Sequence, residues 1–395
     1  MTGRTMATSG ATLPRAADGT REIPHTVSPG LWTLAWRRLR ADRVGMVSLV
    51  IVLAFVAMMI LSGTGLVAKD WSREAGVNYA PPSFIGADVE SGTPAAPAAP
   101  EAPVPAGEFK SSIVDPLADV IAELKGAKPA AAPAEGKSVD PLADVMADIR
   151  ASKGAGAAAP APAEARAATL PFGGDKWGRD VIAKTIKGSE TSIFVGIASA
   201  LVATALGTLF GAVAGYYGRW VDDAFNWFYS VFNAIPYLLL VLAVAAVLQQ
   251  KGMLTIILIL GLTGWTGVFR LIRAEYLKHK AREYVQAADA IGASNARRMF
   301  IHIFPNVSHV VLVQLSILAV AFIKSEVILS FLGFGVPVDV VSWGSMLNEA
   351  QNELILGKWW QLVAAGTAMA LLVTAFSLFT DALRDALDPK LKGLG

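Results

Sequence analysis

Cysteine and histidine, the side chains most typical of transition-metal sites, are scarce in this chain of 395 residues. It contains no cysteine, which excludes disulfides, thiolate metal sites and cysteine nucleophiles. The four histidines are His25, His279, His302 and His309, and they form no tight cluster of ligands. We therefore predict structural roles for the histidines, no metal site and no catalytic residue.

Tyr284 to Asn306 is the only long polar interval between the apolar runs of the C-terminal half, and we call it the polar segment. Ala287 and Ala288 favour a helix and carry little side-chain bulk, so a partner's backbone can come close to them. Gly292 suits the left-handed position that ends such a helix. The first half of the polar segment thus predicts a short helix, a small face at its two alanines, and a turn.

The second half of the polar segment predicts another short helix. Ser294 is suited to cap its start, and Pro305 is expected to stop it. Five residues in between are too apolar for a free loop, so part of this helix must be covered: Met299, Phe300, Ile301, Ile303 and Phe304.

The spacing in the polar segment resembles the EAA loop of ABC importer permeases. Ala287-Ala288 is followed by Gly292 four residues later, and Pro305-Asn306 lies thirteen and fourteen residues beyond the glycine. In that family the loop is a coupling helix that docks into a groove on a cytoplasmic ATPase. The resemblance implies ATPase coupling for Gln286, Ala287, Ala288, Gly292, Pro305 and Asn306, with Gln286 standing where the family usually has glutamate.

Further motifs, from Gly173 to about Lys390, resemble the peptide and nickel branch of the same family. Gly173–Gly188 is similar to a segment at the family's external face, just before its second span. Glu326 and the run Leu329–Gly333 resemble a family segment at the end of the fifth span, which favours a structural or gating role for Glu326. Ser342–Leu347 resembles its following external loop, and Arg384–Pro389 its closing segment.

Composition indicates a polytopic membrane protein, since 54% of residues are hydrophobic and 17% are charged. A helix rises about 1.5 Å per residue, so roughly 20 apolar residues cross a bilayer. Six runs are long enough: about Val44–Leu66, Ser192–Tyr217, Phe225–Leu248, Met253–Ile272, Val307–Leu329 and Trp360–Asp381. Arginine and lysine gather on one side of these runs, which predicts that both termini are cytoplasmic.

The predicted organisation has four parts. Residues 1–43 form a cytoplasmic tail ending in an interfacial segment, where tryptophans and leucines alternate with arginines. Residues 44–66 are the first span, and 173–390 are a core with five spans and the coupling loop at 284–306. Residues 67–172 are an Ala/Pro-rich external insert with two similar copies, Val114–Leu124 and Val139–Ile149, each long enough for a short helix. Two such helices cannot bury a core, which indicates a tether, with a partner-docking site as the alternative.

Three features within the spans bear on packing and transport. Gly207, Gly211 and Gly215 form a stripe of small residues that allows close helix packing in lipid. Pro236 interrupts the third span and predicts a kink beside the translocation path or a packing bend. Lys324 lies near the end of the fifth span, where its ammonium group can reach the interface.

The resemblance implies an all-α membrane protein with six spans and the fold of type I ABC importer permeases. Such a chain forms half of a pore, together with a second permease, two ATPase subunits and an external solute-binding protein, in the inner membrane. Peptides are the expected substrate and nickel the alternative. The sequence has no Walker A motif, so no cofactor is expected here and a partner is expected to hydrolyse ATP.

Two other classes of function are also open to this sequence. A DNA-binding helix-turn-helix shares the Ala-Ala and glycine spacing, but spans flank the polar segment closely and the net charge is only +2. A secondary transporter would carry ionisable residues near the bilayer midplane and weak internal repeats among its spans. Neither feature is found in the predicted spans.

Overall fold

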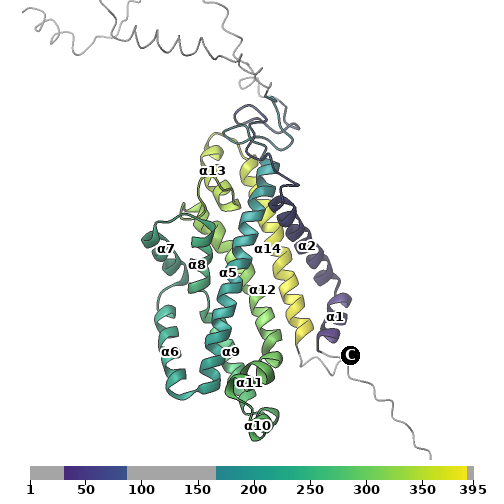
Figure 1. Cartoon of the computed structure of the whole chain (residues 1–395). Coiled ribbons are helices and arrows are strands. Elements are labelled where there is room, and N and C mark those ends of the chain that lie inside the picture. The colour runs from purple at the N-terminus through teal and green to yellow at the C-terminus, as the bar shows by residue number, and fades with distance from the viewer. Residues whose placement is uncertain (1–30, 87–165, 389–395) are drawn as a thin grey trace, which may run out of the picture.

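The computed structural model describes residues 31–86 and 166–388, and these form an elongated bundle of helices (Figure 1). The elements, in chain order, are α1 Leu31–Ala41, α2 Arg43–Gly63, α5 Val181–Tyr217, α6 Arg219–Asn233, α7 Tyr237–Leu248, α8 Met253–Thr263, α9 Thr266–Lys280, α10 Glu283–Ala290, α11 Asn295–Arg297, the π-helical turn η1 Arg298–Ile303, α12 Phe304–Phe331, α13 Trp343–Ile355 and α14 Trp360–Leu387. The described residues contain isolated β-bridges but no extended strand.

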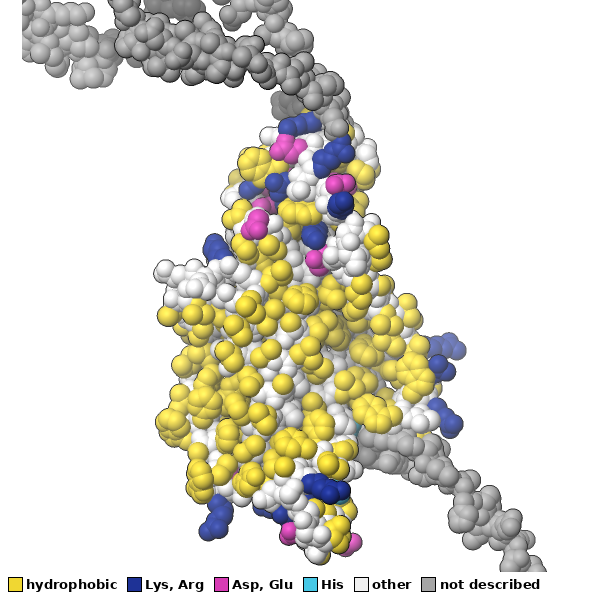
Figure 2. Space-filling view, viewed as in Figure 1, with side chains coloured by type: hydrophobic (Ala, Val, Ile, Leu, Met, Phe, Trp, Pro, Cys, Tyr) yellow, Lys and Arg dark blue, Asp and Glu magenta, His cyan; other side chains and the backbone are white. Residues whose placement is uncertain are grey.

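Within the described residues, four helices are long and apolar enough to cross a membrane: α2, α5, the continuous run Asn295–Phe331, and α14. Two bent pairs, α6 with α7 and α8 with α9, raise the number to six if each pair is one span. Figure 2 shows hydrophobic side chains over the middle of the molecule and most charged side chains near its two ends. This distribution fits a bundle whose middle lies in lipid.

Helix α5, 37 residues long, lies at the centre of the bundle and packs against α2, α8, α9 and α12. The predicted glycine stripe faces α9. A Cβ atom added to Gly207 would lie 2.7 Å from the Trp265 carbonyl oxygen, and one added to Gly215 would lie 2.6 Å from the Arg273 carbonyl oxygen. Only glycine permits this approach of two helix backbones, so the packing role predicted for the stripe is confirmed.

Two of the apolar runs are broken by sharp bends. The axis turns by 83° between α6 and α7, with Pro236 capping the second helix, and by 42° between α8 and α9 at Gly264 and Trp265. Pro236 has no backbone N–H to continue the helix, which accounts for the break predicted there. The bend makes α6 and α7 two short helices at a steep angle to each other (Figure 1).

The second apolar run starts earlier than predicted. Helix α5 begins at Val181 and not near Ser192, because Asp180 caps it by accepting a hydrogen bond from the Ile182 N–H at 2.9 Å. The predicted start was placed where the apolar run begins, and the charged residues Lys184 and Lys187 in the first turns of α5 precede that point. Both lysines are paired with carboxylates, so the helix extends beyond the apolar run.

An irregular cap covers the end of the bundle beside α13. It is built from both described ends of the predicted insert, since Gly76 pairs with Ala167 and Pro82 with Leu170. Ala80 is fully buried within it. The two similar copies at 114–124 and 139–149 lie outside the described residues.

Candidate functional site

The polar segment projects from the opposite end of the bundle, which we call the α10 end (Figure 1). Helix α10 stops at Ala290, and Gly292 follows with a φ of +79°, the left-handed conformation that its sequence position predicts. The Ala293 N–H then donates to the Ala288 carbonyl oxygen at 3.0 Å. Ser294 caps α11 by accepting a hydrogen bond from the Arg297 N–H at 3.3 Å. The predicted helix, turn and capped second helix are therefore present.

The prediction that Pro305 stops the second helix is wrong. Residues 295–331 form one continuous helical run in which α11 leads through η1 into α12. Pro305 lies in the first turn of α12, where its missing N–H is tolerated, and the wider π-helical turn immediately precedes it. The Asn306 side-chain amide donates to the His302 carbonyl oxygen at 2.8 Å, which supplies a donor next to the proline. The second half of the polar segment, from Asn295, is thus continuous with α12.

The two alanines of α10 face different ways, which corrects the prediction of one small outward face. Ala288 is 4% exposed and is packed inside this chain, together with Val285. Ala287 and Gln286 are exposed. Adjacent residues on a helix point about 100° apart, so one of the two alanines can face outward while the other faces the bundle. Only Ala287 of the pair is available to another protein.

Several apolar side chains of the polar segment are exposed at the α10 end. Ile291, next to the glycine turn, is 84% exposed, Ile301 is 60% exposed and Phe300 is 49% exposed. Met299 and Ile303 are buried, as the prediction of a partly covered second helix requires. Ile291 was not predicted to be a surface residue, although its position beside a left-handed glycine at the end of a short helix is a signal of exposure.

Two tyrosines connect the polar segment to the rest of the bundle. The Tyr216 hydroxyl, at the end of α5, donates to Asn295 Oδ1 at 3.0 Å. The Tyr276 hydroxyl, on α9, donates to the Met299 carbonyl oxygen at 3.2 Å. Both tyrosine rings are buried in one apolar cluster with Met299 and Ile303. A displacement of the polar segment would therefore act on α5, α9 and α12 together.

Arg298 holds the two halves of the polar segment together. One guanidinium nitrogen lies 2.5 Å from Asp289 Oδ1 on α10, and another donates to Asn295 Oδ1 at 2.5 Å. The same guanidinium lies 5.8 Å from the centre of the Tyr216 ring.

The structure places Pro236 and Glu326, the two candidates for the translocation path or gating, on different elements. Pro236 is exposed at the bend between α6 and α7. Glu326 is fully buried in α12, where its Oε1 accepts a hydrogen bond from the Ser330 hydroxyl at 2.7 Å. The backbone of α13 passes close by, since a Cβ on Gly344 would lie 2.5 Å from the Val327 carbonyl oxygen. Glu326 thus lies at the junction of α12 and α13.

A buried ionic cluster that was not predicted from the sequence lies near the end of the bundle beside α13, the α13 end. The Lys184 side chain is 2% exposed, and its ammonium group donates to Asp175 Oδ2 at 2.7 Å, to Glu349 Oε2 at 2.5 Å and to Gln361 Oε1 at 3.2 Å. Glu353 is also buried, and this burial raises the pKa of its carboxyl group to about 7. Asp175 precedes Lys184 by nine residues, but Glu349 and Gln361 follow it by 165 and 177 residues, which explains why no local pattern indicates the cluster.

Comparison with known proteins agrees with this arrangement. Residues 207–393 match the family described as binding-protein-dependent transport system inner membrane component. Residues 30–82 match the N-terminal transmembrane domain of oligopeptide transport permease C. The dipeptide transport system permease protein DppC of Bacillus subtilis is 38% identical over 221 residues, which cover 56% of this chain and 69% of that relative. The chain belongs to the family of binding-protein-dependent inner membrane components.

Two further relatives show the same relationship to this permease. The oligopeptide transport system permease protein OppC of Bacillus subtilis is 36% identical over 56% of this chain and 72% of the relative. The OppC protein of Haemophilus influenzae is 34% identical over 55% of this chain and 70% of the relative. With its apolar helices, family membership makes this permease a multi-pass inner membrane protein, and its family consists of transport subunits that are not themselves enzymes.

Proposed function

We propose that this permease forms one half of the translocation pore of an ATP-driven peptide importer. The relatives named as dipeptide and oligopeptide permeases support peptides as the substrate over nickel, the alternative within the same family. In the proposed assembly a second permease chain completes the pore. Two ATPase subunits bind on the cytoplasmic side, and a solute-binding protein delivers the peptide from outside.

The α10 end is the proposed docking surface for an ATPase subunit and therefore faces the cytoplasm, as do both chain termini. The observation that supports this proposal is that the polar segment exposes apolar side chains on its outer surface while its inner surface is bonded to the helices of the bundle. Its outer surface presents Ala287, Ile291 and Ile301 to solvent. Its inner surface is bonded to α5 and α9 and is continuous with α12.

ATP binding and hydrolysis in the docked subunit would move the polar segment and, through it, the pore helices. The π-helical turn η1 and the helix α12 transmit this movement without an intervening loop. In this proposal the bends at Pro236 and between α8 and α9, where straight helices are interrupted, lie on the pore side of the bundle. Gln286, Gly292, Pro305 and Asn306 shape the docking element in this proposal, while Glu326 keeps α12 attached to α13.

Site-directed cross-linking tests the docking surface, and the absence of native cysteine makes single-cysteine variants straightforward. Ala287→Cys places a thiol on the exposed side of α10, whereas Ala288→Cys places one on its buried side. Treatment of assembled importer with a short bifunctional reagent should link Ala287→Cys, and not Ala288→Cys, to the ATPase subunit. Equal yields from both variants, or none from Ala287→Cys in an assembled complex, would contradict the proposal.

A further inference from the structure

Helices α2 and α14 leave an apolar groove on the outer surface of the bundle. The helices are in close contact at Gly45, where an added Cβ would lie 2.7 Å from the Ala382 Cβ. Beside this contact lies a groove of about 350 Å³. Its buried lining residues are Ser48 and Ala375, small side chains that leave the space between the two helices open.

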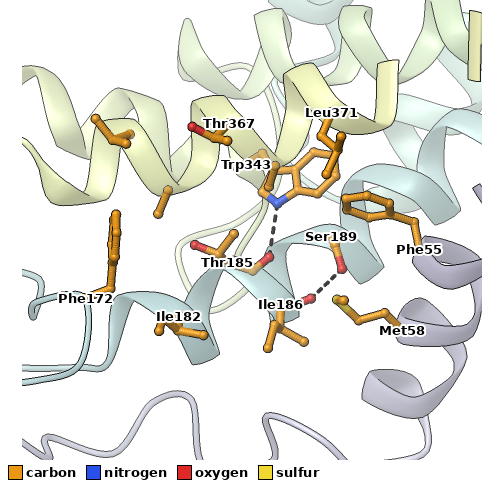
Figure 3. Close-up of a pocket in the computed structure, with 13 residues that line it drawn as sticks. Phe55, Met58, Phe172, Ile182, Thr185, Ile186, Ser189, Trp343, Thr367 and Leu371 are labelled. Atoms are coloured by element: carbon orange, nitrogen blue, oxygen red, sulfur yellow. Dashed lines mark hydrogen bonds between the residues drawn. The ribbon is translucent and has the colours of Figure 1, made fainter. Parts of the chain in front are cut away.

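The groove runs along the helices and not across them. Its α2 side is formed by residues 44, 47, 48 and 51, and its α14 side by residues 371, 374, 375 and 378. Both sets have the spacing of one helix face, and each extends over about two turns, roughly 10 Å. Leu371 also lines a second apolar cavity of about 450 Å³ between α2, α5 and α14, near Phe55 and Trp343 (Figure 3). The apolar crevice therefore continues toward the α13 end.

The α10 end of the groove is basic. Arg43, the first residue of α2, lines the groove there, and no ion-pair partner for it is found in the described part of the chain. Arg37 and Arg40 on α1 are exposed, and the Arg40 guanidinium lies 4.7 Å from the centre of the Trp36 ring. Figure 2 shows basic side chains projecting from the molecule beside α1. The nearby carboxylate of Asp42 is engaged by the Val44 N–H at 3.0 Å.

We propose that this groove binds an anionic phospholipid from the leaflet at the α10 end. One acyl chain lies along the groove between α2 and α14, and the phosphate group lies against Arg43 and Arg40. In a bilayer the groove opens to hydrocarbon, while the first residue of α2 lies at the depth of the headgroups. Exposed tryptophans on α1, Trp32 and Trp36, are typical of that interface. Uncompensated arginines favour a lipid with net negative charge over a zwitterionic one.

Lipid retention by the purified full-length chain tests the proposal. The chain is extracted from vesicles of phosphatidylglycerol and phosphatidylcholine with identical acyl chains, in equal amounts, and retained lipids are counted by native mass spectrometry. Wild type should retain phosphatidylglycerol preferentially. Arg43→Gln should lower its retention about fivefold and leave phosphatidylcholine unchanged, since one basic residue is removed. Thr374→Trp, which fills the groove from an exposed position, should lower the retention of both lipids.

Two matched variants serve as controls. Arg219→Gln removes an exposed arginine at α6, away from the groove, and Val50→Trp adds bulk to an exposed α2 position that does not line it. Equal retention of the two lipids by wild type would overturn the proposal. The proposal would also be overturned if Arg43→Gln lost no more lipid than Arg219→Gln, and Thr374→Trp no more than Val50→Trp. Release of the lipid when the chain assembles with its partner subunits would overturn it as well, because a protein would then cover the groove.

Discussion

Tyr216 and Asn295 join the end of α5 to the start of α11, through a hydrogen bond of 3.0 Å from the tyrosine hydroxyl to Asn295 Oδ1. The two residues are 79 positions apart in the sequence. Arg298 donates to the same Oδ1 atom, so Asn295 accepts from both α5 and η1. This shared acceptor ties the orientation of the polar segment to the end of α5.

Tyr216→Phe should weaken coupling while leaving the fold intact. The substitution removes one hydrogen bond, worth about 1 kcal/mol, and retains the buried ring. In the reconstituted importer we expect a lower coupling ratio, that is, fewer peptides taken up for each ATP hydrolysed. Tyr217→Phe is the control, because the neighbouring Tyr217 is 46% exposed and has no hydroxyl hydrogen bond among the described contacts. Identical coupling ratios for the two variants would argue against a role for the Tyr216 bond.

Gly292→Ala should impair coupling through backbone strain. A φ of +79° costs a residue with a Cβ atom about 1 kcal/mol or more, so the turn after α10 would relax and displace the docking surface. We expect normal insertion, reduced transport and ATPase activity that no longer depends on substrate. Gly267→Ala is the matched control, since it lies within α9 and a Cβ there meets nothing within 4 Å. Wild-type transport by Gly292→Ala would show that the turn is not needed.

Lys184→Met should destabilise the α13 end strongly. Removing the ammonium leaves the fully buried Asp175 without its ionic partner, a change that typically costs about 3–5 kcal/mol. Thermal unfolding in detergent should show a large decrease in Tm, partly restored by adding Asp175→Asn. Lys187→Met, which breaks the partly exposed pair with Glu190, should cost at most about 1 kcal/mol. Equal decreases in Tm for the two lysine variants would contradict the assigned burial.

Glu353 should make the stability of the same end depend on pH. Its folded-state pKa of about 7 lies above the ordinary glutamate value, because burial favours the neutral acid. The stabilisation is fully present below the ordinary pKa and is lost as pH rises through 7. We expect the Tm of the wild type to fall between pH 5 and pH 8, and Glu353→Gln to flatten that part of the curve. An unchanged slope in the variant would exclude Glu353 as the group responsible.

Local patterns predicted the polar segment better than its surroundings. Gly292 and Ser294 adopt their predicted conformations because a left-handed turn and a helix cap depend on neighbouring residues alone. Pro305 was misjudged because a preceding π-helical turn, which has no sequence signature, allows the helix to continue. Helix α10 packs against α9 and η1, and the alanine pair itself does not reveal that Ala288 is the buried member.

Hydropathy located the apolar runs but not their ends or their charges. The start of α5 at Val181 depends on the Asp180 cap and on the pairing of Lys184 with Glu349, a carboxylate distant in the sequence. The glycine stripe at 207, 211 and 215 was predictable because close helix packing requires small residues at this spacing. The bend at Pro236 was predictable as well, although its angle of 83° was not.

Uptake in vesicles that contain this chain with its permease, ATPase and solute-binding partners tests the central claim most directly. Labelled dipeptide uptake is measured with and without ATP, and again after a protonophore has collapsed the proton gradient. Moving one charge through the membrane potential is worth only about 2.3 kcal/mol per 100 mV and requires a coupling site in the membrane. We predict uptake that requires both ATP and the ATPase and that persists with the protonophore. Uptake by this chain alone, driven by a pH gradient without ATP, would contradict the account and identify a secondary transporter.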